Sequence, residues 1–255
     1  MISKAYFLDC GICHLDKSVL IGPSGAGIVV KVPVFSMLLE SDSGWTLIDT
    51  GLNPTGVTDP DKAWGPRAKT VKPTMKPEND INYRIKELGL KNDDIKRIIL
   101  THMHWDHTGG NRFFPNAIFY VQRAEYRFAY YPDKIISGSY MRDHFDCGSK
   151  YELIEGDTEI IPGVYVFQSP GHTPGHQSVL IKMKSGKKLL ITGDAVYTQQ
   201  NVDLMLPPGN NWDPNYSIFS LNKIKTIQEQ TGAILIPAHD PDFWDNVPRS
   251  PDAVI

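Results

Sequence analysis

The chain has 255 residues, enough for one large domain or two small ones. Hydrophobic residues make up 41% and charged residues 22%, which is typical of a globular protein that builds its own core. The formal net charge of −3 argues against the basic surface of a nucleic-acid-binding protein, and no apolar run is long enough for a membrane span. We therefore expect neither nucleic acid nor a membrane as a partner.

The N-terminal segment has no apolar run long enough for the core of a secretory signal peptide. Cys10 and Cys13 form a C-x-x-C pair, but no second pair or nearby His-x-His completes a structural zinc site. Cys147 makes the cysteine count odd, which argues against a disulfide framework. We therefore expect reduced, structural cysteines and a cytoplasmic protein.

Short runs rich in β-branched residues, each bounded by Gly, Pro, Asp or Asn, predict strands along the chain. Two segments with apolar residues at helical spacing predict helices at 79–88 and 214–230, and Gly232 is a plausible C-cap of the second helix. No linker divides the chain, so we expect one domain over residues 1–255, of mixed α/β (α+β) class with helices outside sheets. The predicted strands cover residues 28–39, 45–48, 98–100, 117–121, 164–167, 178–181, 188–191 and 233–236.

Two stretches fit neither pattern. Residues 51–77 are rich in Pro, Gly and charge, with Trp64 and Met75 among them, and residues 130–150 are mixed and aromatic. Loops this long in a compact domain are usually functional or disordered. We interpret both as lids or substrate-contacting insertions, with surface padding or a dimer contact as the alternative.

Six of the eight histidines gather at the ends of predicted strands. The first cluster follows Leu100 and reads T-H-M-H-W-D-H-T-G-G over residues 101–110. Because residues two apart in an extended segment point the same way, His102, His104 and Asp106 are expected to converge on one side. His107 comes where the chain must turn and can face a second point. Four ligand-type side chains so close together predict a metal site rather than core filling.

Three further strand ends carry ligand-type residues. Residues 170–176 read P-G-H-T-P-G-H, in which Pro and Gly predict a tight loop that presents His172 outward. His176 is interpreted as a support of this loop through hydrogen bonds, with a ligand role as the alternative. Asp194 can cap a helix, but beside two histidine clusters it is a candidate bridging carboxylate. His239 follows the last predicted strand.

The candidate ligands divide into two sets of three that share one carboxylate. Imidazole and carboxylate donors suit zinc, and also iron, manganese or cobalt. The sequence therefore predicts two divalent ions, with zinc the first choice, about 3.5–4 Å apart. The first set is His102, His104 and His172, the second is Asp106, His107 and His239, and Asp194 can bridge the two.

This pattern resembles the signature of the metallo-β-lactamase superfamily: H-x-H-x-D-H, a His in P-G-H-x-x-G-H, then G-D and a late His. D-T-G at residues 49–51 also resembles an early element of that family, in which Asp49 would orient a ligand histidine. The resemblance covers the whole chain. It implies an αββα sandwich with the site along one edge, between two β-sheets.

Within that superfamily the chain resembles the N-acyl homoserine lactone lactonases, which quench quorum signals. Its length fits a single catalytic domain, and D-A-V-Y at residues 194–197 resembles their D-x-x-Y element, whose tyrosine, here Tyr197, reaches into the site. The opening segment with Tyr6-Phe7, Gly11, Cys13 and Leu15-Asp16 is similar too, as are I-E-G-D at 154–157 and P-G-V at 162–164.

The resemblance implies a mechanism of lactone opening. A hydroxide that bridges the two ions and is held by Asp194 would attack the ester carbonyl. Tyr197 would donate a hydrogen bond to the developing oxyanion, and Asp106 or Asp194 would carry a proton to the leaving oxygen. The acyl tail needs an apolar groove, for which residues 20–30, Trp64 and Met75 are candidates, with core packing or a dimer contact as the alternative.

Other activities share this fold and its ligands. A glyoxalase II-like thioesterase normally has a basic, helical C-terminal extension, whereas about 16 residues follow His239 here. An iron-dependent sulfur dioxygenase would hold a single iron, so metal stoichiometry separates it from a dinuclear hydrolase. The expected partner is a small lactone with an acyl chain, and a homodimer is compatible with the resemblance.

Overall fold

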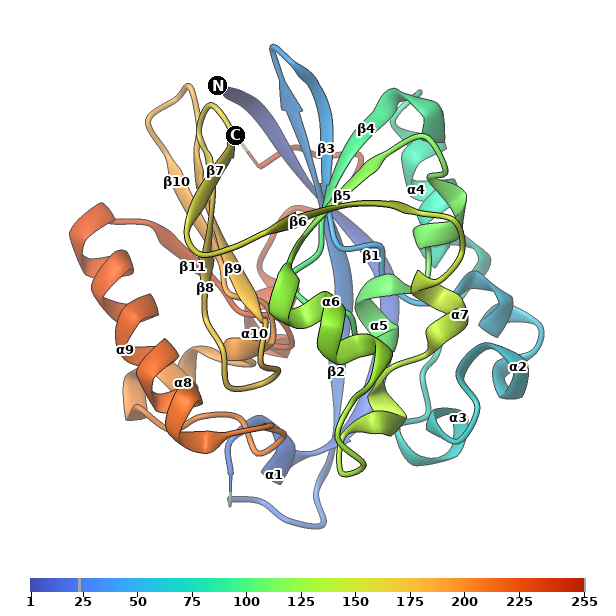
Figure 1. Ribbon diagram of the computed structural model, residues 1–255, viewed down its shortest axis with the longest axis vertical. Helices are drawn as coiled ribbons and strands as arrows, with labels where there is room; N and C mark the ends of the chain where they lie inside the picture. Colours follow the sequence, from blue (N-terminus) through green and yellow to red (C-terminus); the bar gives the residue numbers. More distant parts are fainter. Residues whose placement is uncertain (23, 255) are drawn as a thin grey trace.

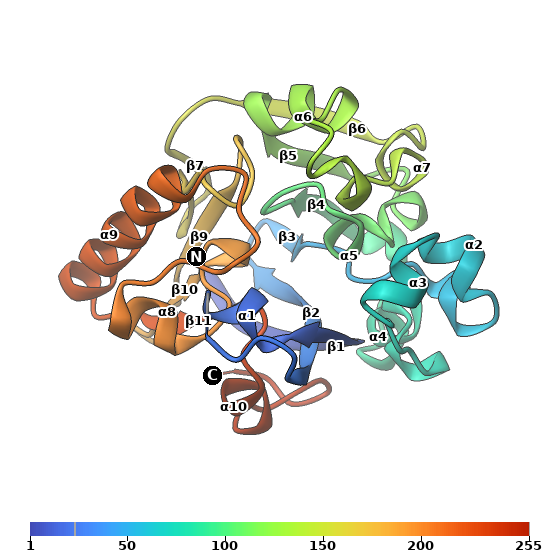
Figure 2. The same cartoon turned by 90° about the horizontal axis from the view of Figure 1, so that it is seen from below.

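The computed structural model describes residues 1–22 and 24–254. Pro23, within the predicted groove segment 20–30, and Ile255, at the end of the predicted domain, lie outside the described residues. Two β-sheets pack face to face, and helices cover their outer sides (Figures 1 and 2). The predicted αββα sandwich is therefore confirmed.

The first sheet has six strands in the order β1-β2-β3-β4-β5-β6. The first three strands pair antiparallel, and β3 through β6 pair parallel. Four of the six strands were predicted; the two at the edges of the sheet, β1 and β6, were missed. The strands are β1 (Ile2–Asp16), β2 (Val29–Ser41), β3 (Gly44–Ile48), β4 (Ile95–Ile99), β5 (Ile118–Gln122) and β6 (Lys150–Ile154).

The second sheet has five strands in the order β11-β10-β9-β8-β7. β10 and β11 pair parallel, and the other neighbours pair antiparallel. All of these strands except β7 were predicted. They are β7 (Thr158–Ile161), β8 (Val164–Gln168), β9 (Gln177–Lys182), β10 (Lys188–Ile191) and β11 (Ile234–Ile236).

Apolar side chains from both sheets form the core between them. Phe7 and Met37 from the first sheet join Val166 and Ile181 from the second in one buried cluster. The ring of Phe7 meets that of Phe35 edge to face, with centroids 5.4 Å apart. Because this core fixes the two sheets against each other, the strand ends that carry the candidate ligands are also fixed.

Both predicted helices are present, as α4 (Ile81–Glu87) and α9 (Pro214–Thr231). Gly232 ends α9 in the left-handed conformation, with φ of 67°, as its C-cap position requires. Ile218, one of the apolar residues of this segment, is 45% exposed, because the buried face of α9 is centred on Ser217, Leu221 and Ile224. No helix in the described part of the chain is long and apolar enough to cross a membrane.

The remaining helices are short and were not predicted individually. Several lie in the two segments interpreted as insertions, so those segments are folded rather than irregular. The helices are α1 (Lys17–Leu20), α2 (Pro60–Trp64), α3 (Arg67–Thr70), α4 (Ile81–Glu87), α5 (Trp105–Thr108), α6 (Arg123–Tyr130), α7 (Arg142–Phe145), α8 (Gln199–Leu204), α9 (Pro214–Thr231) and α10 (Pro241–Asp245).

Trp64 anchors the first of these insertions. Its indole is 1% exposed and belongs to the core, so its prediction as part of an acyl groove was wrong. Gly56 lies directly against this indole, where a Cβ would overlap the ring. The insertion therefore folds around a buried tryptophan that needs a glycine as its neighbour.

We expect Gly56→Ala to destabilise the protein by about 1–3 kcal/mol, the usual cost of forcing an extra methyl group into a packed site. Urea unfolding followed by fluorescence measures this change. Gly65→Ala is a poor control because Gly65 has a φ of 50°, whereas Gly138→Ala adds the same methyl group where it meets only the guanidinium of Arg67, at 3.9 Å. Unchanged stability in Gly56→Ala would show that Trp64 moves freely.

Candidate metal centre

The first cluster of ligand-type residues follows the end of β4. His102 and His104 lie in an extended segment, and α5 begins at the next residue, Trp105. The alternation of an extended chain therefore ends there, so Asp106 turns away from the two histidines with which it was expected to converge. Asp106 instead groups with His107 and His239, as the division into two sets predicts.

The second cluster lies in the loop between β8 and β9. His172 points its Nδ1 at the backbone oxygen of Asn210, 2.7 Å away, and its Nε2 lies 2.9 Å from Nδ1 of His104. His176 lies outside both candidate groups, and its Nδ1 is 2.9 Å from the hydroxyl of Ser169. This contact agrees with the predicted role of His176 in supporting the loop.

Asp194 lies at the centre of the site, in the short turn after β10. One carboxylate oxygen, Oδ1, lies 3.2 Å from Nε2 of His107 and 3.3 Å from Nε2 of His239. The other, Oδ2, lies 3.3 Å from Nε2 of His172. The carboxylate therefore faces both sets of histidines, as a bridging ligand must.

The ligand-type atoms form two groups, and within each group they lie within 4.8 Å of one another. Every member is buried except Asp106, which is nearly so. The first group contains His102, His104, His172 and Asp194, and the second contains Asp106, His107 and His239.

Buried polar atoms without partners show that the site fits metal ions. Among the described residues, Nε2 of His102, His104 and His107 and Oδ1 of Asp194 have no hydrogen-bond partner. A buried polar atom without a partner costs free energy, so native proteins rarely leave several of them together. Divalent ions would satisfy Nε2 of His102 and His107 and Oδ1 of Asp194 at once, while His104 presents Nδ1 rather than Nε2 to the other ligands of its group.

The opposite ring nitrogens are held from outside the site. Nδ1 of His107 lies 2.7 Å from Oδ2 of Asp49, and Nδ1 of His239 lies 2.8 Å from the backbone oxygen of Pro33. Such contacts fix the ring orientation and direct Nε2 inward. The orienting role expected for Asp49 therefore has a direct geometric counterpart.

Asp49 has a strained backbone, with φ of 56°. Its carboxylate accepts hydrogen bonds from the backbone N–H of Thr101 and from the hydroxyl of Thr101, both at 2.8 Å. These contacts, together with His107, hold the residue in a conformation that non-glycine residues seldom adopt. Backbone strain of this kind is common where a site must be held in a fixed geometry.

The electrostatics favour neutral imidazoles in the first group. Burial lowers the pKa of His102, His104 and His172, so these rings are neutral near pH 7, the form that binds metals. Burial alone would also lower the pKa of His107, but the negative charges of Asp194, Asp49 and Asp106 raise it above its usual range. The second group therefore attracts a positive charge.

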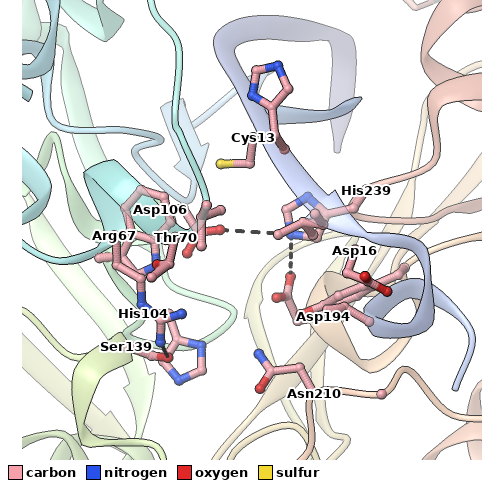
Figure 3. Close-up of a pocket in the computed structure, with 17 residues that line it drawn as sticks. Cys13, Asp16, Arg67, Thr70, His104, Asp106, Ser139, Asp194, Asn210 and His239 are labelled. Atoms are coloured by element: carbon pink, nitrogen blue, oxygen red, sulfur yellow. Dashed lines mark hydrogen bonds and ion pairs between the residues drawn. The ribbon is translucent and has the colours of Figure 1, made fainter. Parts of the chain in front are cut away.

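A cavity of about 340 Å³ opens beside the two groups (Figure 3). Asp194 and His239 lie on one side of it and Asp106 and His104 on the other, and Tyr197 is also among its lining residues. No described residue of the predicted groove segment 20–30, and neither Trp64 nor Met75, is among its lining residues. The wall is instead formed by Cys13, His14, Leu15, Asp16 and Val19 at the N-terminus and by parts of both insertions.

Sequence reasoning missed the contacts that join the two insertions at this cavity. The guanidinium of Arg67 donates hydrogen bonds to the hydroxyl of Ser139, at 2.6 Å, and to the backbone oxygen of Gly138, at 3.2 Å. Arg67 and Ser139 both line the cavity, which supports the interpretation of the insertions as substrate-contacting segments. No local motif links residues so far apart, so only the fold could reveal the pair.

Comparisons with known proteins agree with this geometry. Residues 29–239 match the sequence model of the metallo-β-lactamase superfamily. The chain is 34% identical over 240 residues to an N-acyl homoserine lactonase of Bacillus cereus, covering 94% of each chain. It is 35% identical over 258 residues to the N-acyl homoserine lactonase AttM of Azorhizobium caulinodans, covering 97% of each chain.

Solved structures are similar over the whole chain. An N-acyl homoserine lactone hydrolase with the product N-hexanoyl-L-homoserine at its catalytic metal center superposes with a TM-score of 0.91, at 32% identity and with 100% of both chains covered. The dizinc quorum-quenching lactonase AidC shares the fold, with a TM-score of 0.72 at 17% identity, covering 99% of this chain and 94% of AidC.

Proposed function

This chain belongs to the metallo-β-lactamase superfamily, and from that premise we propose that it is a dinuclear metal-dependent hydrolase that opens the lactone ring of N-acyl homoserine lactones. The observation that carries the proposal is the pair of buried ligand groups facing one shared carboxylate, Asp194, beside a cavity. The relatives that match nearly the whole chain are N-acyl homoserine lactonases, which supports quorum quenching as its role.

We propose that the two ions are held by the two groups of residues described above. His102, His104 and His172 would hold the first ion, Asp106, His107 and His239 the second, and Asp194 both. Zinc is the first choice for these donors, although cobalt, manganese and iron accept the same set. When bound, such a pair of ions lowers the pKa of a water molecule and polarises an ester carbonyl.

Tyr197 is proposed to stabilise the reacting carbonyl. Its side chain lines the cavity, and its ring centroid lies 4.8 Å from that of His239. Burial and the negative charge of Asp194 raise the pKa of this phenol well above its usual range. The hydroxyl therefore keeps its proton at neutral pH and can donate a hydrogen bond that strengthens as the carbonyl oxygen gains negative charge.

Asp106 is proposed to move a proton to the leaving group, with Asp194 as the alternative. Its Oδ2 borders the cavity and lies 3.9 Å from Nε2 of His239. Water adds its oxygen to the carbonyl carbon, and the ring C–O bond breaks. One proton goes to the released alcohol oxygen, and the new carboxylic acid ionises and releases a proton to solvent. The product is an N-acyl homoserine.

We expect Tyr197→Phe to lower kcat for N-hexanoyl homoserine lactone by about 100-fold, the usual cost of losing one donor to a developing oxyanion. Metal content should stay at the wild-type level, because the phenol belongs to neither ligand group. Tyr216→Phe, at an exposed position on α9, serves as the control. Kinetics unchanged from wild type on several lactones would remove Tyr197 from the mechanism.

The products of the reaction test the proposed activity. After incubation with N-hexanoyl homoserine lactone, mass spectrometry should find one product, heavier than the substrate by one water and with its amide intact. Hexanoic acid together with homoserine lactone would mean amide cleavage instead. Turnover of a glutathione thioester without turnover of the lactone would favour the thioesterase alternative.

We also propose that residues 1–255 form one catalytic domain in a reducing cytoplasm. Residues from the first 20 positions and from positions beyond 230 line the same cavity, which supports a single unit. Cys10, Cys13 and Cys147 are all free, which supports a reducing compartment.

A further inference from the structure

Glu125 is a completely buried carboxylate that the proposed mechanism does not use. It lies in the first turn of α6, and its side chain is fully enclosed by protein. It has no salt-bridge partner among the residues that the structure describes. A buried negative charge without a cation needs several hydrogen bonds to be tolerated, so the groups that donate to it are informative.

Four donors surround this carboxylate, one for each of its lone-pair positions. Oε1 accepts from the backbone N–H of Met103 at 2.9 Å and from the hydroxyl of Tyr140 at 3.0 Å. Oε2 accepts from the hydroxyl of Thr173 at 2.6 Å and from the backbone N–H of Gly175 at 3.2 Å. The carboxylate is therefore satisfied entirely by groups from other segments.

These donors belong to the segments that carry two of the candidate ligands. Met103 lies between His102 and His104, and Thr173 follows His172 directly. Tyr140 packs its ring edge to face against His104, with centroids 4.7 Å apart. Glu125 therefore binds the backbone segments that carry His104 and His172, and it also binds Tyr140, whose ring packs against His104.

The packing around Glu125 requires a close approach of two backbones. Gly175 lies so near the backbone of Glu125 that a Cβ would overlap it. The loop that carries His172 belongs to the second sheet, whereas α6 follows β5 of the first sheet. Glu125 therefore ties the two halves of the sandwich together beside the ligands of the first ion.

The second group of ligands is held by a different carboxylate. Asp49 lies 2.7 Å from Nδ1 of His107 and also binds Thr101, and Glu125 contacts neither His107 nor His239. Asp49 thus contacts a ligand of the second group directly and reaches the first group only through the hydroxyl of Thr101, which lies 3.1 Å from Nδ1 of His102.

We propose that Glu125 is the positioning residue for the first ion, because it holds His104 and His172 in register, whereas the direct contact of Asp49 is with His107, a ligand of the second ion. The proposal rests on the two-ion site described under Proposed function, but its test measures metal binding alone and needs no lactone. Loss of Glu125 should weaken one ion site and leave the other intact.

Glu125→Gln is the sharpest variant, because the side chain keeps its shape. Whichever oxygen becomes the amide nitrogen, two of the four donors then face a group that cannot accept a hydrogen bond. Glu155→Gln is the matched control, since Glu155 is exposed and pairs with Arg123 at the start of the same helix. Zinc binding to the metal-free proteins is measured by competition with a chromophoric chelator, and folding by circular dichroism.

Wild type and Glu155→Gln should bind two zinc ions tightly. Glu125→Gln should bind one as tightly as wild type and the other about 10- to 100-fold more weakly, the usual cost of losing an outer partner of a metal ligand. Asp49→Asn should lower the affinity for the other zinc ion. The double variant Glu125→Gln/Asp49→Asn should therefore bind neither ion tightly.

Three results would overturn the proposal. The first is wild-type affinity for both zinc ions in Glu125→Gln, and the second is an equal loss of affinity for both ions in that variant. The third is one zinc ion still bound with wild-type affinity in the double variant. If Glu125→Gln does not fold, Thr173→Val removes a single donor and keeps the side-chain shape. That variant should still weaken one ion several-fold, and wild-type affinity for both ions in it would equally overturn the proposal.

Discussion

Asp194→Asn should lower kcat/KM for N-hexanoyl homoserine lactone by about 1000-fold, or ~4 kcal/mol, and should also reduce the bound metal below two ions per chain. The change is isosteric, so the packing of this buried side chain stays the same. It removes the negative charge that faces histidines of both groups and leaves one oxygen where two are needed to reach both ions. Steady-state kinetics and metal analysis of the same preparation measure the two effects together.

Asp203→Asn provides the matched control, because Asp203 is an exposed aspartate on the nearby helix α8. It should leave both rate and metal content at the wild-type level. Two tightly bound ions in Asp194→Asn would contradict the bridging role of Asp194. A wild-type rate with one ion would contradict the dinuclear mechanism.

Removal of the metal should abolish activity and also lower the melting temperature. Ligands that bind only the folded protein stabilise it by about 2.7 kcal/mol at 100 times their dissociation constant, which corresponds to roughly 5–10 °C for a chain of this size. Without ions, the buried Nε2 atoms of His102 and His107 have no hydrogen-bond partner among the described residues. Differential scanning calorimetry before and after dialysis against a chelator measures the shift.

Zinc returned to the metal-free protein should restore both the activity and the melting temperature. Cobalt and manganese should restore the melting temperature as well, because the donor set accepts them. Full activity in protein shown to hold no metal would contradict a metal-dependent mechanism. A melting temperature that does not change with metal would mean that the ions do not bind the folded protein in preference to the unfolded chain, which would contradict a buried metal site.

The strands differ in how clearly the sequence predicts them. After Lys188, the residues of β10 are all apolar and buried, and polar turns bound the strand, so its sequence alone identified it. β1 was missed because Asp9, Gly11 and other polar residues interrupt its apolar pattern. Its register shifts between Asp9 and Ile12, where Gly11 has a φ of 113°, so no simple alternation remains to be seen.

The candidate ligands were predictable for a different reason. Clustered histidines and aspartates at strand ends are costly to bury unless they bind a metal ion or form hydrogen bonds. The fold brings all seven candidate metal ligands into the two groups. Glu125 gave no such signal, because its donors come from segments 15 to 50 residues away in the chain. The acyl groove was mispredicted because the apolar character of Trp64 serves the core equally well.

The most direct test of the lactonase proposal is proton release by the zinc-loaded protein in weakly buffered N-hexanoyl homoserine lactone at neutral pH. Lactone opening produces an ionised carboxylate, so we expect rapid release that a chelator stops and that Asp194→Asn lacks. No release from protein shown to hold two ions would contradict the lactonase proposal, while membership of the metallo-β-lactamase superfamily would stand.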